Sequence, residues 1–238
     1  MVTRFWDIVS VASEEREHAI LLDGKPMHLP GGGILRVRLR PLAEAIADEW
    51  RAAGGAKGGE MTFADTPLTR LAGTAQERVA PNPDPTIDAI ARYGENDLLC
   101  YRAEHPPALV QRQAKAWQPW LDWAALTYDA PLRVTAGVGP IRQHRDSISA
   151  LRHAVASLDV NALTALGIAV PALGSLVLGL ALAEGRISPG DAHVLGALDE
   201  LFQEEEWGAD DEAVARRAGV AADIALAARY IALTREAE

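Results

Sequence analysis

The feature that most constrains the fold is a long uncharged run between Asp159 and Glu184, which reads VNALTALGIAVPALGSLVLGLALA. A helix of about 20 apolar residues is long enough to cross a bilayer, so a membrane-spanning helix is one interpretation of the run. However, the run is rich in Ala, Gly and small polar residues, is interrupted by Pro171, and lacks basic or aromatic residues at its ends. These properties favour two buried helices that meet near Pro171.

The first forty residues have a different pattern, because they are rich in residues that favour strands. The stretch AILLDGKPMHL contains Asp23 and Gly24, which form a typical two-residue hairpin turn between two strands. In ILRVRLRP the apolar residues alternate with arginines, as in a strand with one buried face. The chain is therefore expected to begin with a small β-rich part, with the arginine row on its solvated face.

Helical spacing begins at Pro41, where Leu42, Ile46 and Trp50 form one stripe that ends at Gly54. The following stretch, GGAKGG, does not match a phosphate-binding loop, because it follows a helix and Lys57 is not followed by Ser or Thr. It is interpreted as a flexible surface linker.

A second helix is predicted from Thr66 to Val79, and the three prolines of APNPDPT then mark a domain boundary. The residues beyond this boundary have mostly helical patterns. The predicted fold class is α+β, with a small β-rich N-terminal domain followed by a mainly α-helical C-terminal domain. The predicted domains are residues 1–80, β-rich, and residues 81–238, all-helical.

Charge and cysteine content narrow the class of partner and the compartment. The formal net charge is −10, which disfavours a nucleic-acid surface because phosphate contacts need a basic stripe. Cys100 is the single cysteine, so no intrachain disulfide can form and a reducing compartment is favoured. The N-terminal residues show no signal or transit pattern, so a bacterial cytoplasmic location is expected, with the mitochondrial matrix as the equivalent for a processed eukaryotic relative.

Motifs of catalysis and cofactor binding are missing from the sequence. The six histidines are scattered without a metal-ligand spacing, and Ser175 lies in an apolar helical segment that does not match a nucleophile elbow. The glycines 31–33 precede a strand, whereas a dinucleotide-binding fingerprint opens a helix. No catalytic residue, metal or cofactor is therefore predicted.

An acidic segment, LDELFQEEEWGAD, lies near the end of a predicted helix from Ser188 to Trp207. Ser188 is the expected N-cap, Pro189 fits the first helical position, and Asp191 completes a sequence typical of a capping box. At about 100° per residue, Leu195, Leu198 and Phe202 lie on one face of this helix. The opposite face carries Glu200, Gln203, Glu204 and Trp207.

This acidic face can be an ordinary solvated helix surface, and three other interpretations remain open. Trp207 can be an anchor for a partner protein, since aromatic residues with polar neighbours contribute strongly to interfaces. Alternatively, Trp207 can pack beneath the following helix at a turn formed by Gly208. A catalytic role is the weakest reading, because the consecutive Glu204, Glu205 and Glu206 point in different directions around a helix.

Several stretches, in order along the chain, resemble the ATP-synthase assembly chaperones of the Atp-twelve family, which occur in mitochondria and in related α-proteobacteria. They are RFW at residues 4–6, LDGKP at 22–26, LAEAIADEW at 42–50, TPLTRLAGTA at 66–75, DLLCYRA at 97–103, WQPWLDWA at 117–124 and GSLVLGLAL at 174–182. The last motif is an acidic residue, a glutamine and Trp-Gly, here Glu200, Gln203, Trp207 and Gly208. The chain departs from the family at Glu77, where Asp is frequent, and at Asn96, where Thr is common.

The resemblance implies a non-enzymatic chaperone that holds the α subunit of the F1 sector of ATP synthase until it pairs with β. On this reading the partner-binding residues are Glu200, Gln203, Glu204, Trp207 and Gly208, no cofactor is needed, and the free protein is expected to be monomeric. The alternative function is a carboxylate-dependent hydrolase whose acids, for instance Asp97, Asp122 and Glu200, converge from separate helices.

Overall fold

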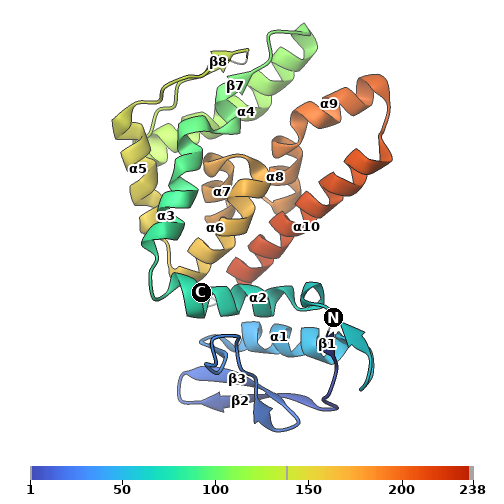
Figure 1. Cartoon of the computed structure of the whole chain (residues 1–238). Coiled ribbons are helices and arrows are strands. Elements are labelled where there is room, and N and C mark those ends of the chain that lie inside the picture. Colours follow the sequence, from blue (N-terminus) through green and yellow to red (C-terminus); the bar gives the residue numbers. More distant parts are fainter. Residues whose placement is uncertain (1, 138, 236–238) are drawn as a thin grey trace. The chain divides into compact units, whose positions relative to one another are not determined.

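The computed structural model describes residues 2–137 and 139–235. The chain divides into two compact units, one formed by the described residues of Met1–Pro83 and Arg229–Glu238 and the other by those of Asp84–Ala228 (Figure 1). The first unit contains the sheet and the second is mainly helical, so the predicted α+β class is confirmed. The domain limits 1–80 and 81–238 stay a prediction about which parts of the chain fold independently.

The main sheet of the first unit is antiparallel, with β3 at its centre. Its strands are β2 (Val9–Glu14), β3 (Glu17–Leu22), β4 (Lys25–Pro26) and β5 (Arg36–Val37). β3 pairs with all three of the others. Asp23 and Gly24 both have positive φ, as the predicted two-residue turn between β3 and β4 requires. β1 (Val2–Thr3) pairs with β6 (Glu60–Met61) in a separate short sheet.

Helix α1 (Arg40–Ala52) packs against β2 and β3. Its stripe is the predicted one, with Leu42 and Ile46 buried and Trp50 half-buried, and it contributes to a core that includes Trp6 and Ile20. The side chains of Trp6 and Trp50 are in contact, with ring centroids 4.8 Å apart and ring planes tilted by 54°. The burial of these large apolar groups is the main source of stability for this unit.

GGAKGG is predicted to be a flexible surface linker. In the structure, however, Arg4 holds this loop in place. The buried guanidinium of Arg4 donates hydrogen bonds to the carbonyl oxygens of Arg51, Ala53 and Gly55 at 2.9, 3.1 and 2.7 Å. A side chain at Gly59 would overlap a carbonyl oxygen of the same loop. The sequence pattern missed this arrangement because Arg4 lies about fifty residues earlier in the chain.

The helix predicted from Thr66 to Val79 forms as α2 (Pro67–Thr74), and its last turn, residues 75–79, is a π-helix. Two side chains of this turn hold the glycine-rich loop before β5. Glu77 accepts the Gly31 N–H at 3.0 Å, and Gln76 bonds both the Ile34 carbonyl and the Arg36 N–H. The Gln76 amide thereby satisfies two main-chain groups beside the short strand β5. A short 3-10 turn, Phe63–Asp65, precedes α2.

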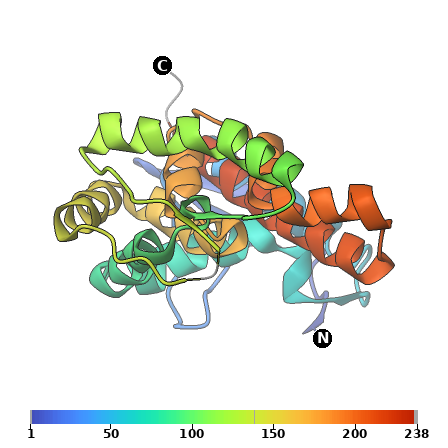
Figure 2. The same ribbon diagram turned by 90° about the horizontal axis from the view of Figure 1, so that it is seen from above.

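The second unit consists mainly of helices, with α6 and α7 packed against each other and partly surrounded by the rest (Figure 2). The helices are α3 (Asp84–Ala91), α4 (Pro107–Tyr128), α5 (Arg145–Ala156), α6 (Val160–Leu173), α7 (Leu176–Ala183), α8 (Pro189–Gly196), α9 (Leu198–Trp207) and α10 (Asp211–Leu233), with 3-10 turns at Arg92–Asn96 and Leu98–Cys100. α10 crosses the unit boundary, which falls between residues 228 and 229.

The uncharged run folds as two buried helices, as predicted, but they meet at Gly174, three residues beyond Pro171. Gly174 adopts the left-handed conformation, and Ser175 caps α7 by accepting the Leu178 N–H. A single membrane-spanning helix is therefore the wrong interpretation of the run. Every helix within the described residues is too short or too polar to cross a bilayer.

The second unit also holds a pair of two-residue strands, which the expectation of an all-helical domain over 81–238 did not include. β7 (Tyr101–Arg102) and β8 (Thr135–Ala136) pair in parallel. Strands this short leave almost no periodicity in a sequence, so pattern analysis does not detect them. Nearby, Cys100 is buried as predicted, and burial raises the pKa of its thiol to about 12.

Candidate partner-binding surface

The acidic segment lies on α9, which is a separate helix and not the end of a single helix from Ser188 to Trp207. The predicted cap forms, since the Ser188 hydroxyl accepts the Asp191 N–H at 3.1 Å. The helix then stops at Gly196, and a new one begins at Leu198. The carbonyl of Leu195 accepts the indole N–H of Trp117 at 3.0 Å, so a side chain from α4 takes the place of the next helical hydrogen bond.

One side of α9 is joined to α10 by ion pairs, and both views draw these helices side by side (Figures 1 and 2). Glu200 lies 3.1 Å from Arg216 and 3.7 Å from Arg217, and Glu204 also pairs with Arg217. Arg217 is buried, and its side chain is only 11% exposed, so both carboxylates lie against a partly desolvated charge. Glu200 and Glu204 therefore anchor α9 and do not simply face solvent.

The other side of α9 is joined to α4. Arg112 donates to both carboxylate oxygens of Glu205 at 2.9 and 2.8 Å, and this interaction lowers the pKa of Glu205. The same guanidinium lies 5.1 Å from the centre of the Phe202 ring, within cation–π range. Gln113, which is buried, donates to Asp199 at 2.7 Å. α9 is thus fixed by polar contacts along two sides.

Trp207 is 81% exposed at the end of α9. The interpretation that it packs beneath the following helix is therefore wrong. Gly208 shapes the turn, as expected, with a φ of 93°, and α10 begins only at Asp211. Gln203 is exposed on the same helix. Exposed aromatic side chains of this size are the usual anchors of protein interfaces.

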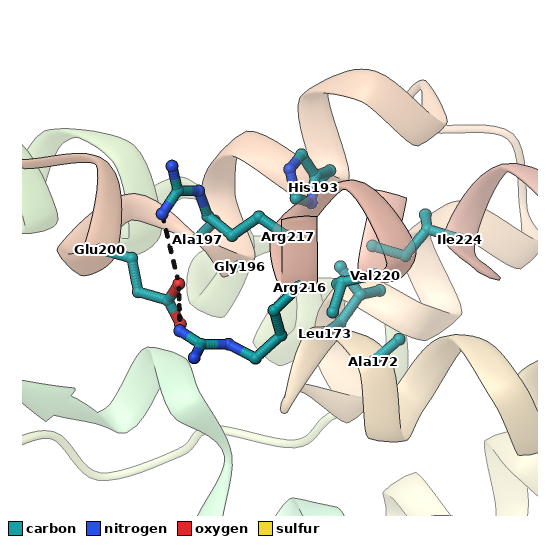
Figure 3. A pocket seen from close by; sticks show the side chains of 10 residues that line it. All are labelled: Ala172, Leu173, His193, Gly196, Ala197, Glu200, Arg216, Arg217, Val220 and Ile224. Carbon is teal, nitrogen blue, oxygen red and sulfur yellow. Dashed lines mark hydrogen bonds and ion pairs between the residues drawn. The ribbon is translucent and has the colours of Figure 1, made fainter. Parts of the chain in front are cut away.

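A small cavity of about 70 Å³ lies between α6, α8, α9 and α10 (Figure 3). Its lining combines His193, Glu200, Arg216 and Arg217 with apolar side chains that include Leu173. Burial, together with the nearby Arg217 guanidinium, lowers the pKa of His193. The cavity is far smaller than the roughly 300–1,000 Å³ of typical ligand pockets, so it does not resemble a cofactor site.

The three acids of the alternative hydrolase reading have separate partners. Burial raises the pKa of Asp97 to about 6, but its carboxylate accepts main-chain N–H groups from Leu99 and Val177 at the start of α7. Asp122 accepts from Gln118 on its own helix, and Glu200 pairs with arginines of α10. Asp97 is therefore a buried helix cap: burial raises its pKa, while the main-chain N–H groups that it accepts lower it.

Comparison with solved structures gives the class of protein. Atp12 from Paracoccus denitrificans matches with a TM-score of 0.90 and 45% identity over 98% of both chains, as does an aspartate-to-lysine mutant of that protein. A chaperone candidate from Agrobacterium tumefaciens matches with a TM-score of 0.87 and 37% identity over 98% of this chain and 85% of its own. By fold, the chain is thus of the Atp12 class.

Sequence comparison gives the family. The model of the family described as ATP12 chaperone protein matches residues 3–125, more than half of the chain. The mitochondrial protein atp12 of Schizosaccharomyces pombe is 23% identical over 222 residues, which cover 88% of this chain and 75% of the relative. The chain belongs to the ATP12 chaperone protein family, and the resemblance to the Atp-twelve family found in its motifs is confirmed.

Proposed function

We propose that this chain is an assembly chaperone for the F1 sector of ATP synthase, and that it binds the unassembled α subunit until that subunit pairs with β. Membership of the ATP12 chaperone protein family supports the chaperone role. An unpaired subunit of an obligate complex exposes a large apolar interface, and a binding protein can cover that interface without any catalytic step.

The observation that carries the proposal is the exposed indole of Trp207 on a helix that is fixed in place. The ion pairs of α9 with Arg217 and Arg112 hold the helix, so little conformational freedom would be lost when a partner binds its tip. A large aromatic group on such a preorganised support is a typical hot spot.

The five candidate residues have different parts in this proposal. Trp207 and Gln203 are exposed and contact the α subunit directly. Glu200 and Glu204 keep α9 in position through their arginine partners, and the exposed part of Glu200 forms the edge of the contact. Gly208 gives the turn that directs Trp207 outward.

The test is co-expression with the α and β subunits separately, followed by size-exclusion chromatography and a binding titration. We expect a one-to-one complex with α and none with β. Trp207→Ala should weaken binding to α by about 30-fold or more, the effect of a hot spot worth at least about 2 kcal/mol, while the melting temperature stays the same.

Leu126→Ala is the matched control. Leu126 is a large apolar residue that is 88% exposed, and it lies fourteen residues after Arg112, about 20 Å further along α4. It should leave binding unchanged. If the wild-type chain binds neither subunit, the proposed function is wrong. If it binds α and Trp207→Ala binds equally well, the function stands and the proposed surface is wrong.

A further inference from the structure

The strand β2 has one edge without a partner in the described part of the chain. It pairs with β3 from Val9 to Glu14, and β3 in turn pairs with β4 and β5 on its other side. Figure 1 draws β2 and β3 side by side, with α1 over them. α1 packs against this hairpin, and among the described strands only β3 pairs with β2.

The hydrogen-bond pattern shows which main-chain groups this edge presents. The Asp23 N–H donates to the Ile8 carbonyl, so even-numbered residues of this segment bond to β3. In an antiparallel pair the bonded residues alternate, and the odd residues Val9, Val11 and Ser13 direct their N–H and C=O groups outward. Among the described residues, these outward groups have no main-chain partner.

This edge lacks the features that normally prevent strand addition. Proteins protect edge strands with proline, lysine, a bulge or an extremely short strand. β2 is six residues long, VSVASE, and its register with β3 is continuous. Its one charged residue, Glu14, is the last. The edge is therefore a ready template for another extended segment.

Two exposed apolar side chains lie shortly before β2 in the sequence. Ile8 is 66% exposed and Phe5 is 64% exposed. A segment that pairs with β2 and extends past Val9 would meet the side chain of Ile8. Main-chain bonds along β2 and apolar contact at Ile8 would then act together, as in other complexes formed by strand addition.

The charges at the two ends of β2 favour a different protein over a second copy as occupant. In the antiparallel pairing of two copies centred on Val11, Asp7 of each copy lies opposite Glu15 of the other. In a parallel pairing, the carboxylates of Glu14 and Glu15 lie beside their own equivalents. Like charges at such positions are destabilising, although Lys57 and Arg36 partly neutralise Asp7 and Glu14.

We propose that the outer edge of β2 binds an extended segment of the client protein as an additional strand. The segment that fits is uncharged and free of proline over about five residues, with an apolar side chain opposite Ile8 and basic residues at its ends. The identity of the client as the unassembled α subunit of F1 rests on the proposed function.

The experiment is hydrogen–deuterium exchange of the full-length chain, free and in complex with the α subunit, resolved to single amides. In the free chain the amides of Val9, Val11 and Ser13 should exchange rapidly, while those of Ser10 and Ala12, which bond to β3, exchange slowly. In the complex the three outward amides should slow by at least about tenfold, and the inward ones serve as the internal reference.

Two variants with matched controls test the same edge by affinity. Val11→Pro removes an outward N–H without removing a bond to β3, and Val11→Thr keeps the N–H with a side chain of similar shape. Ser13→Lys places a charge at an exposed position, and Ser13→Ala, which also loses the hydroxyl contact with His18, is its control. Both blocking variants should weaken binding by about tenfold or more, with folding checked by circular dichroism.

The outcomes separate this proposal from the proposed function. If the chain binds α and the outward amides of β2 exchange as in the free chain, the strand-addition proposal is wrong and the function stands. If the chain binds no α subunit, both are wrong. If light scattering shows a dimer of this chain in which the same amides are protected, the occupant is a second copy and the client assignment is wrong.

Discussion

Replacing Arg4 with methionine should strongly destabilise the chain, because its guanidinium is the centre of the loop after α1. Arg4 is 7% exposed and donates to four carbonyl oxygens, those of Trp6, Arg51, Ala53 and Gly55. Three of these bonds share Nη1, which has two hydrogens, so we count about three full hydrogen bonds. At roughly 1.5 kcal/mol each they contribute about 4–5 kcal/mol.

The net effect is smaller, because the variant no longer buries a charged group. We therefore expect a loss of about 3 kcal/mol, which lowers the melting temperature of a chain of this length by roughly 6–12 °C. Methionine retains the length and the apolar stem of the side chain, so a cavity contributes little. Urea unfolding and calorimetry measure both quantities.

Arg70→Met is the control, since Arg70 is exposed on α2 and should change stability by less than about 0.5 kcal/mol. Arg4→Lys should fall between the wild type and Arg4→Met, because one ammonium group cannot reach all the carbonyls that the guanidinium reaches. If Arg4→Met unfolds within 0.5 kcal/mol of the wild type, the claim that Arg4 holds this loop is refuted.

Three further predictions concern the pH dependence, the position of α9 and the glycines. The pKa of Asp97 in the folded chain, about 6, lies above its ordinary value of 3.8. The folded chain therefore holds this proton more tightly than the unfolded chain, and the free energy of unfolding should fall by about 3 kcal/mol as the pH rises from about 4 to about 6. Asp97→Asn should flatten this dependence in urea titrations, and parallel wild-type and variant curves would contradict the assignment. A double-mutant cycle of Arg112→Ala and Glu205→Ala should show a favourable coupling that shrinks when NaCl is raised from 0.05 to 0.5 M, because both side chains are largely exposed; a salt-independent coupling would be inconsistent with this. Gly59→Ala should cost about 1–3 kcal/mol because its Cβ overlaps the facing carbonyl, whereas Gly219→Ala, in open space within α10, should stabilise the chain by about 0.5–1 kcal/mol, with thermal melts to compare the two.

Local pattern predicted the elements whose causes are local. The turn at Asp23 and Gly24, the stripe of Leu42 and Ile46, and the buried run after Asp159 all follow from residues close together in the sequence. The same holds for the cap at Ser188. Such features depend on backbone preference and hydrophobic periodicity, which can be read within a window of a few residues.

Apart from the two-residue strands β7 and β8, the missed features depend on side chains from distant parts of the chain. The break after Gly196 needs the indole of Trp117, which is 78 residues away from the Leu195 carbonyl that it bonds. The order of the GGAKGG loop needs Arg4, and the position of α9 needs Arg112 and the arginines of α10. A charge pattern shows that glutamates are present on a helix, but it does not show which arginine each one meets.

The structure also separates motif residues that maintain the fold from those that are available to a partner. Trp6 and Trp117 are fully buried, and each donates its indole N–H to a main-chain carbonyl. Asp97 caps α7 from within the core. Trp207, in contrast, is the single tryptophan among the six with an exposed side chain. Because the internal structure explains the buried motif residues, the resemblance of those motifs to a chaperone family reflects a shared fold. A binding role therefore has to be tested at Trp207 and at the free edge of β2, where the described structure supplies no internal partner.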